Sequence, residues 1–432
     1  MSLLDNIVLG SEKVPVVLDI GAAYTKCGFA GESCPRHILP SSVVTCVDGK
    51  EKVVKFIDYA GNSQELVKLL KRFIHNIFFK YLLVNPKDRR MVIVESVLCP
   101  NTFKNSLAKV IFQHFEIQSA MFAPGHLMGL YSLGLPTAMI VDCGYSEAIV
   151  LPFYETASLF NCCQVSNLAG KVINSHLEKL LLLYASITYG NETKPFAAER
   201  GPLTEDILEE IKVKACVSGH NPNYEDNASE STIKPLPAKP MKFHLGPSKV
   251  LTIPGEVRDK MLDAVFKPDC NDISLASMII DCLLMCPIDI RKDLAASICV
   301  TGGCAAIPGF NWRLKEELTV LANSPRYKDE LSVKTFKFYE TVVHPNYTNW
   351  LGGSICGILE NLPDRSISRE TFLKAEYVPD WTHSRKRLRS VAQAIMKKVS
   401  GEKTPSLASV VSKIMTSSAK AKLPKVAIND DS

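Results

Sequence analysis

The sequence predicts a mixed α/β protein built from two related halves, and two short segments carry most of that prediction. Residues 16–21 (VVLDIG) and 139–144 (MIVDCG) are apolar runs that end in Asp-x-Gly, and a second β-prone stretch follows each of them, over 24–29 and 147–151. A glycine two residues after an aspartate at a strand end permits a tight reversal, so each segment predicts a β-hairpin with a carboxylate at its tip. The repetition indicates two related half-molecules.

We expect the two hairpin tips to face one another across a cleft. Turn amides there could hold phosphate oxygens, while the two aspartates steer a hydrated Mg²⁺ ion. The alternative interpretation is a pair of ordinary hairpins, because a single Asp-x-Gly is common by chance.

The segments around the hairpins alternate between helical and strand-like patterns, which supports a mixed sheet. Apolar residues at helical spacing predict helices, and short β-branched runs predict strands: helices over 64–84, 103–115, 127–133, 273–285 and 312–322, and strands over 91–95 and 294–300. The polar, proline-rich stretch 219–249 is predicted to be a long surface excursion. The globular part is expected to end near Trp381.

Composition narrows the class of protein. The chain has 432 residues, enough for two or more domains, and 46% hydrophobic with 22% charged residues is typical of a soluble globular protein. No apolar run reaches membrane-spanning length, and residues 1–13 lack the pattern of a secretory signal. The 14 cysteines are scattered, which favours reduced thiols in a cytosolic or nuclear setting, and a structural zinc is not expected.

Charge is distributed unevenly along the chain. The net charge is +5, but the segment 385–432 holds 11 Lys/Arg against 3 Asp/Glu, so the body before it is mildly acidic. Nothing therefore suggests a nucleic-acid-binding core. Apolar stripes over 388–399 and 407–415 leave two alternatives for this basic tail: a flexible tail with nascent helices, or two helices that dock on a partner or an acidic polymer.

Five collinear motifs resemble actin. Residues 19–32 (DIGAAYTKCGFAGE) resemble its first phosphate hairpin, 142–145 (DCGY) its second, and 300–309 (VTGGCAAIPG) its adenosine-side loop. Residues 349–354 (NWLGGS) and 286–294 (CPIDIRKDL) are similar to two further actin segments. Because the motifs run through nearly the whole body in order, the chain is identified as a member of the actin family.

This resemblance implies an actin-like, ribonuclease H-like duplicated α/β fold, with two lobes around a nucleotide cleft and a reduced pointed-end subdomain. The expected parts are a small lobe of 1–134 plus 342–384 (subdomains 1 and 2, subdomain 2 roughly 41–61), a large lobe of 135–341 (subdomains 3 and 4, subdomain 4 roughly 169–250), and the basic tail 385–432, expected to be partly helical.

The resemblance also implies a nucleotide site. The residues that match it are Asp19, Gly21, Lys26, Asp142, Gly144, Gly170, Lys212, Gly302 and Gly303. It implies ATP or ADP with Mg²⁺, kept as a structural element rather than hydrolysed, with the ion held through the nucleotide near the two aspartates. Lys26 would meet the β- and γ-phosphate oxygens as a point charge. The alternative is an empty or collapsed cleft.

Several positions depart from the family pattern where hydrolysis is concerned. Compared with actin, the replacements are Ala22 for a serine, Ala23 for a glycine, Tyr145 for an aspartate, Ser146 for a glycine, Gly125 with its neighbour His126 in the region of the water-orienting glutamine, Ile149 for a histidine, and Val213 for the acid that meets the ribose. Phosphoryl transfer to water depends on positioning and electrostatics, so we expect no effective ATPase and assign no catalytic residue.

Within the family, residues 81–100 and 123–128 are similar to the actin-related subunit at the pointed end of dynactin. The resemblance implies a cytoplasmic, cytoskeletal building block whose partners are the actin-related filament subunits of dynactin, its other pointed-end subunits and, indirectly, dynein. It implies neither nucleic-acid binding nor membrane insertion. The segment 41–63 is shorter than the corresponding segment of actin, which contacts the next subunit of the filament. The chain is therefore expected to cap the filament. The alternative is a loop deletion without functional consequence.

Two other functions remain open at the level of sequence. One is an active actin-type ATPase, which measured turnover would reveal. The other is a nuclear actin-related subunit of a chromatin-remodelling complex, for which the basic cluster 385–389 could serve as a nuclear address.

Overall fold

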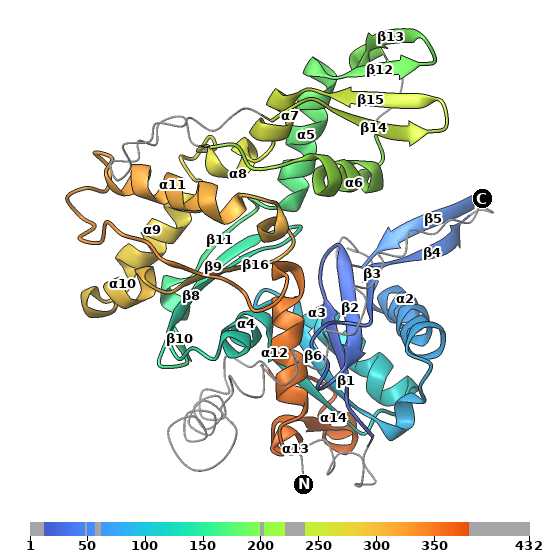
Figure 1. The fold of residues 1–432 in the computed structure, drawn as a ribbon. Helices are drawn as coiled ribbons and strands as arrows, with labels where there is room; N and C mark the ends of the chain where they lie inside the picture. The colour runs from blue at the N-terminus through green and yellow to red at the C-terminus, as the bar shows by residue number, and fades with distance from the viewer. Residues whose placement is uncertain (1–12, 48–49, 57–61, 199–202, 221–237, 380–432) are drawn as a thin grey trace. The chain divides into compact units, whose positions relative to one another are not determined.

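The structure is a computed structural model, and it describes residues 13–47, 50–56, 62–198, 203–220 and 238–379. Contacts divide the chain into two compact units (Figure 1). The first unit takes in the described residues of Met1–Pro136, Glu155–Ala157 and Thr341–Ser432, and the second takes in those of Thr137–Tyr154 and Ser158–Glu340. The basic tail predicted over 385–432 lies outside the described residues.

A six-stranded mixed sheet, in the order β18-β7-β6-β1-β2-β3, forms the centre of the first unit. Its strands are β1 (Val16–Ile20), β2 (Tyr24–Phe29), β3 (His37–Pro40), β6 (Arg90–Glu95), β7 (Ser119–Pro124) and β18 (Ile367–Ser368). β1 pairs antiparallel with β2 and parallel with β6, which in turn pairs parallel with β7. The hairpin predicted over 16–29 is therefore confirmed.

Helices and a small separate sheet complete the first unit. The helices are α2 (Ser63–Asn76), which continues as a π-helical turn η1 (Ile77–Tyr81), α3 (Asn101–Lys109), which continues as the π-helical turn η3 (Val110–His114), η2 (Pro86–Asp88), α4 (Gly125–Leu133), η7 (Pro345–Tyr347), α12 (Thr348–Gly357), α13 (Leu362–Arg365) and α14 (Arg369–Ala375). β4 (Ser42–Val47) and β5 (Lys50–Lys55) pair antiparallel as a two-stranded sheet.

Strand periodicity divides the first unit's apolar side chains between two faces of the sheet. Val16 and Leu18 of β1 are buried in one cluster with Leu70 and Ile74 of α2. The side chain between them, Val17, belongs to the opposite face, where α12 packs: a Cβ added at Gly353 would lie 3.3 Å from its Cγ1. The alternating pattern of β1 therefore fixes which helices cover each face.

Small residues let α12 approach its neighbours closely. A Cβ at Gly352 would lie 1.9 Å from the carbonyl oxygen of Met128 on α4, so no side chain fits there. Trp350, fully buried, donates its indole N–H to the carbonyl of Val17, with 3.1 Å between nitrogen and oxygen. The motif at 349–354 thus anchors α12 to β1 and α4.

The second unit repeats the central arrangement of the first. Its main sheet has the order β10-β9-β8-β16-β17, with β11 also paired to β9. The strands are β8 (Ala138–Cys143), β9 (Ala148–Tyr154), β10 (Ala157–Ser158), β11 (Gln164–Ser166), β16 (Ile298–Thr301) and β17 (Phe338–Tyr339). β8 pairs antiparallel with β9 and parallel with β16, which pairs parallel with β17, as β1 does with β2, β6 and β7. The second predicted hairpin and the duplication are confirmed.

A second sheet and a set of helices complete this unit. The sheet has the order β13-β12-β15-β14, and its strands are β12 (Ser186–Tyr189), β13 (Glu192–Pro195), β14 (Met241–Gly246) and β15 (Lys249–Ile253). The helices are η4 (Phe160–Cys162), α5 (Gly170–Tyr184), η5 (Phe196–Ala198), α6 (Glu205–Ala215), α7 (Gly255–Lys260), α8 (Asp263–Phe266), α9 (Leu275–Met285), α10 (Ile288–Ala295), η6 (Cys304–Ala306) and α11 (Phe310–Ala322). None of the described helices is both long and apolar enough to cross a membrane.

Two predicted segments need correction. The excursion predicted over 219–249 is wrong at its end, where β14 forms and Phe243 is buried against the core. Met241, Phe243 and Leu245 alternate with polar residues as in a strand, but this short pattern directly follows a proline-rich stretch. The strand predicted over 294–300 begins only at Ile298, because Leu294 belongs to α10.

Candidate functional site

The first hairpin places a carboxylate and an ammonium side by side. Asp19 on β1 and Lys26 on β2 are register partners, and Lys26 Nζ lies 3.0 Å from Asp19 Oδ2. Their side chains are 13% and 15% exposed, so the pair is largely but not fully shielded from water. Partial burial strengthens its electrostatic interaction, and the remaining exposure leaves both groups within reach of a charged ligand.

The turn of this hairpin keeps two backbone donors available. The Gly21 N–H donates to the carbonyl of Tyr24 at 3.2 Å, and a Cβ at Gly21 would lie 2.8 Å from that oxygen, so the turn requires glycine. The amides of Ala22 and Ala23 donate no hydrogen bond within the part of the chain that the structure describes. Successive turn amides of this kind form an anion-binding concavity.

Ser41 supports the same turn, and the sequence analysis did not single it out. Its hydroxyl donates to the carbonyl of Gly21 at 2.7 Å and lies 2.8 Å from the hydroxyl of Thr25. Its backbone N–H donates to the carbonyl of Ala23. The sequence shows only that a serine follows β3. The contact of this serine with the Gly21 carbonyl depends on the pairing of β2 with β3.

In the second unit, three separate segments meet at the second hairpin. The Gly144 N–H donates to the carbonyl of Glu147 at 3.0 Å and closes the turn. Gly170, the first residue of α5, donates its N–H to the carbonyl of Gly144 at 3.1 Å. A Cβ at Gly170 would lie 3.3 Å from Tyr145 Cα, so the helix start packs tightly against the turn.

The loop after β16 completes this cluster. Thr301 is the register partner of Asp142, and Gly302 follows with φ +94°. A Cβ at Gly302 would lie 2.3 Å from the carbonyl oxygen of Cys143 and 2.7 Å from Asp142 Oδ1, whereas nothing lies within 4 Å of a Cβ at Gly303. Gly302 therefore serves close packing, and Gly303 borders open space that a flat ring could enter.

Two buried thiols lie within this cluster. The Sγ of Cys304 donates to the carbonyl of Gly144 at 3.1 Å, and Cys143 is fully buried beside Asp142. The hydrogen bond with Cys304 and burial raise the pKa of the Cys143 thiol well above its usual range. Cys143 is therefore a neutral packing residue here.

Lys212 is also buried in the second unit, on α6. Its Nζ lies 2.5 Å from Glu209 Oε2, and the side chain is 5% exposed. Asn174 of α5 donates its amide to the same carboxylate oxygen at 3.1 Å. Glu209 was not predicted, although its three-residue spacing from Lys212 on a helix was a usable signal.

Two buried polar atoms without a hydrogen-bond partner among the described residues indicate whether a polar ligand could bind near these residues. Thr301 Oγ1 and Asn174 Oδ1 are buried and have no hydrogen-bond partner within the described residues. Buried polar atoms in native proteins nearly always have a partner, so the orphaned atoms and the space at Gly303 fit a bound polar molecule. The nine predicted residues thus fall into a set in the first unit (Asp19, Gly21, Lys26) and a set in the second (Asp142, Gly144, Gly170, Lys212, Gly302, Gly303).

Two of the positions that depart from the family pattern, Ile149 and Gly125, carry no polar side chain. Ile149, the register partner of Asp142, is 2% exposed. Gly125 begins α4, and a Cβ there would lie 3.3 Å from the carbonyl oxygen of Glu95. His126 is fully buried, and Val213 on α6 is 65% exposed.

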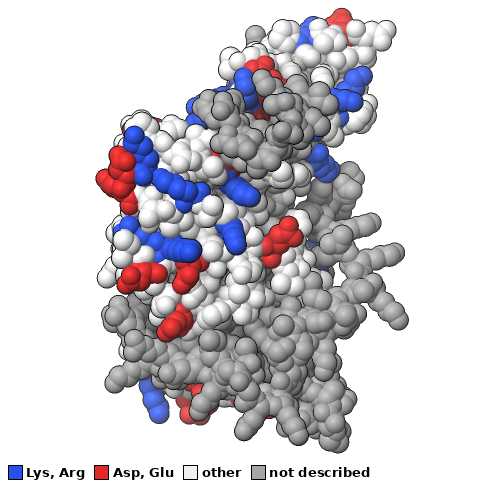
Figure 2. All heavy atoms as spheres, turned by 60° about the vertical axis from the view of Figure 1, so that its left-hand side comes forward, with Lys and Arg blue, Asp and Glu red and all other residues white. Residues whose placement is uncertain are grey.

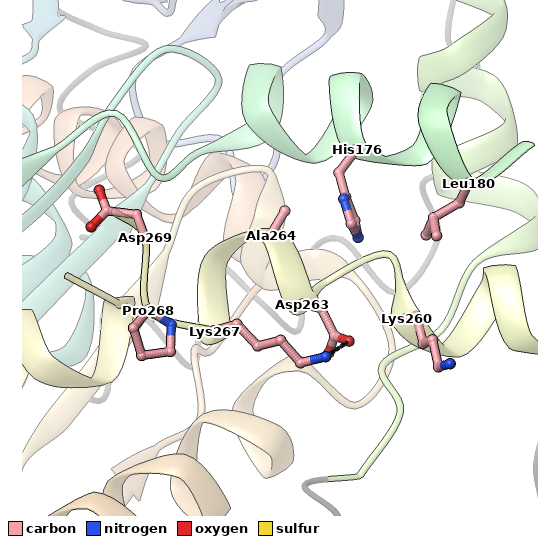
Figure 3. Close-up of a pocket in the computed structure, with 8 residues that line it drawn as sticks. All are labelled: His176, Leu180, Lys260, Asp263, Ala264, Lys267, Pro268 and Asp269. Carbon is pink, nitrogen blue, oxygen red and sulfur yellow. Dashed lines mark ion pairs between the residues drawn. The ribbon is translucent and has the colours of Figure 1, made fainter. Parts of the chain in front are cut away.

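The cavity in the second unit does not coincide with these residues. It measures about 370 Å³ and lies between α5 and α8 (Figure 3). Its lining consists of His176, Leu180, Lys260, Asp263, Ala264, Lys267, Pro268 and Asp269. Lys267 and Lys260 are already paired within their own helical turns, with Asp263 and with Glu256. Asp269 accepts hydrogen bonds from two backbone amides of its own loop.

Among the described residues, the face that carries α10 and α11 holds charges of both signs. Figure 2 shows lysine and arginine side chains interspersed there with aspartate and glutamate. Binding to a phosphate backbone needs a concentrated basic patch, so this face gives no support for nucleic-acid binding.

Two sheets of the same topology, each bearing an Asp-x-Gly hairpin whose turn is closed by glycine, define an actin-like two-unit α/β protein. The chain belongs to the actin family, because the family model for actin matches residues 10–385.

Known relatives support the assignment. The chain is 25% identical to actin-related protein 10 of Dictyostelium discoideum, over 85% of this chain and 89% of that protein. It is 26% identical to actin-related protein 2 of Acanthamoeba castellanii, over 80% and 92%, and 24% identical to putative actin-29 of D. discoideum, over 83% and 94%.

Proposed function

We propose that this protein is a structural actin-related subunit that caps the pointed end of the dynactin filament and so supports dynein-driven transport toward microtubule minus ends. The observation that carries the proposal is the similarity to actin-related protein 10 along 85% of the chain. The segments 81–100 and 123–128, which resemble the pointed-end subunit, add to it. A cytoplasmic location and partners among the filament and pointed-end subunits of dynactin follow from the same proposal.

Capping rests on the region between β3 and α2. Its described part is the two-stranded β4–β5 sheet, and the whole stretch from Ser41 to Ser63 is shorter than the actin segment that grips the next subunit. A filament grows head to tail because each heterologous contact leaves its complement free on the outermost subunit. A subunit that binds the filament through its opposite face, and lacks the segment that contacts the next subunit, ends growth at the pointed end.

The site is proposed to retain ATP or ADP with Mg²⁺. In the first unit, Lys26 and the amides of Ala22 and Ala23 would hold phosphate oxygens, and Asp19 would accept hydrogen bonds from water on an ion. In the second unit, Asp142 would offer its carboxylate to such water in the same way. Gly303 would admit the base while Gly302 keeps the loop packed against the second hairpin, and Gly170 and Lys212 complete this set. The bound nucleotide supplies charge and contacts that stabilise the fold.

Hydrolysis is proposed to be absent. A water molecule must be held in line with the γ-phosphate, and the protein's contribution is positioning and electrostatic stabilisation. The buried Ile149 and the side-chain-free Gly125 supply no hydrogen bond for that purpose. Loss of this positioning costs on the order of 10²-fold in rate for each misplaced group.

The experiment is purification of the tagged full chain from cells, followed by mass spectrometry of the associated proteins. Dynactin subunits at fixed stoichiometry are the expected result, and conventional actin with the same tag, which should not retain pointed-end subunits, is the control. Recovery with chromatin-remodelling subunits in place of dynactin would refute the proposal.

A further inference from the structure

A group of thiols lies at the end of α9, outside the set of residues described above. Cys282 and Cys286 are one helical turn apart, and the Cys286 N–H donates to the carbonyl of Cys282 at 3.2 Å. Cys162, the last residue of η4, donates its thiol to the carbonyl of Met285 at 3.3 Å. We call Cys162, Cys282 and Cys286 the α9 thiol cluster. Their exposed fractions are 6%, 0% and 2%, and all three thiols are free.

The backbone around Cys286 favours its ionised form. The guanidinium of Arg291 donates to the carbonyl of Cys286 at 2.9 Å and to that of Leu284 at 2.6 Å, so a fixed positive charge lies beside the cluster. α10 begins at Ile288, two residues after Cys286, and the start of a helix stabilises a nearby negative charge. A thiolate, not a thiol, is the nucleophilic form of cysteine.

The acidities of the three thiols diverge accordingly. Hydrogen bonds from Cys282 and Cys162, together with Arg291, lower the pKa of Cys286 to about 7, although burial opposes the shift. Burial and the charge on Cys286 raise the pKa of Cys162 to about 11. At neutral pH the protons therefore reside on Cys162 and Cys282, and Cys286 is the member of the cluster that ionises.

Other buried cysteines provide an internal comparison. Burial raises the pKa of Cys299 and of Cys356 to about 12 each, and neither has a thiol neighbour that would lower it. Their exposed fractions, 0% and 1%, are close to that of Cys286. A difference in reactivity between Cys286 and these two residues would therefore reflect chemistry rather than access.

We propose that Cys286 is an oxidation site at which a peroxide generates a disulfide with Cys162. The Cys286 thiolate attacks one oxygen of the peroxide, the O–O bond breaks, and Cys286 sulfenic acid and hydroxide (or alkoxide) form. The Cys162 sulfur then attacks the sulfenic sulfur, the S–O bond breaks, and the proton of the Cys162 thiol leaves with the hydroxyl as water. The peroxide is reduced by two electrons, and the two thiols are oxidised to one disulfide.

Cys162 is better placed than Cys282 to complete the disulfide. Cys282 and Cys286 are held by the same stretch of backbone, and a disulfide requires a specific separation and dihedral angle. Cys162 comes from a three-residue helix between β10 and β11, which can adjust more readily. The bond would tie η4 to the α9–α10 junction, where Met285 is 53% and Ile288 is 69% exposed.

Reactivity of the native full chain is the first test. The reduced protein is alkylated with iodoacetamide at a series of pH values, and the modification of each cysteine is followed by peptide mass spectrometry. Cys286 is expected to react roughly 100-fold faster than Cys299 and Cys356 at pH 7.4, with a rate midpoint near pH 7. Equal rates for the three residues would overturn the proposal.

Disulfide formation is the second test. After treatment with hydrogen peroxide, a non-reducing digest is expected to contain a peptide pair linked through Cys162 and Cys286 that dithiothreitol separates. C282S should retain the linked pair, and C162S should instead accumulate a sulfenic acid on Cys286 that dimedone traps. The assignment would be refuted if the oxidised wild-type protein contained no linked pair, or if Cys286 still formed a disulfide in C162S. The alkylation rates and the digest of the wild-type protein remain valid tests even if a variant fails to fold.

Discussion

Asp142 and Ile149 stand opposite one another on β8 and β9, with the isoleucine side chain buried beside the carboxylate. The carboxylate can order water around a cation, but the apolar neighbour offers neither a donor nor an acceptor to orient an attacking water. The proposal therefore separates holding a nucleotide from cleaving it. The groups proposed for holding are present, and those expected for cleavage are replaced.

The purified full chain is expected to release no phosphate above background from Mg-ATP. Each missing positioning group costs on the order of 10²-fold in rate, and at least two are replaced. Phosphate release is measured by a coupled colorimetric assay, with polymerising conventional actin as the positive control. I149H alone should not restore turnover, because Gly125 still supplies no side chain. A burst of one phosphate per chain would contradict this expectation.

K26M is expected to weaken nucleotide binding roughly 10-fold or more, since a charge-assisted contact with phosphate is lost. Binding of a fluorescent ATP analogue with Mg²⁺ measures the effect. K13M, which removes an exposed lysine paired with Asp88 in the same unit, is the matched control. Unchanged affinity in K26M would remove Lys26 from the proposed site.

The adjacent glycines Gly302 and Gly303 should respond differently to alanine. G302A forces a Cβ to within 2.3 Å of a backbone carbonyl at φ +94°, so a loss of about 2 kcal/mol or more in the free energy of unfolding is expected. G303A meets open space at φ −64° and should change it by less than about 0.5 kcal/mol. Denaturant unfolding monitored by circular dichroism compares the two. Equal losses would mean that the loop after β16 is arranged differently.

A buried ion pair on the first unit should be important for stability. Lys104 Nζ lies 2.7 Å from Glu95 Oε1, and both side chains are about 95% shielded from water. K104M removes the ammonium that lies against this buried carboxylate, and a loss of about 3–5 kcal/mol in the free energy of unfolding is expected. The control is K87M, whose partner Glu116 is on the surface and whose removal should have little effect. Thermal unfolding of the two variants side by side provides the comparison.

The duplicated sheet could be predicted from the sequence because its signals are local. An apolar run, an aspartate and a glycine two residues later determine a hairpin within about fourteen residues, and both hairpins are confirmed. Amphipathic helices such as α2 and α11 were predicted for the same reason. Their ends were less certain, because α2 and α3 both continue into π-helical turns that periodicity does not reveal.

The contacts that complete the site could not be predicted, because they depend on tertiary packing. Ser41 meets the Gly21 carbonyl only through the pairing of β2 with β3, and Cys304 meets the Gly144 carbonyl across a long separation in sequence. β14 was missed because its short alternating pattern follows a proline-rich stretch. Glycines gave the clearest long-range information, since the backbone at Gly170 packs tightly against the second hairpin and the close approach at Gly302 excludes any side chain.

We propose that this chain ends a short filament rather than extending one. Electron microscopy of purified dynactin in which the chain carries a bulky tag at one terminus tests this proposal. We expect one copy of the tag per complex, at the same end of every filament. Tags distributed along the filament, or self-assembly of the purified chain into long filaments, would contradict it.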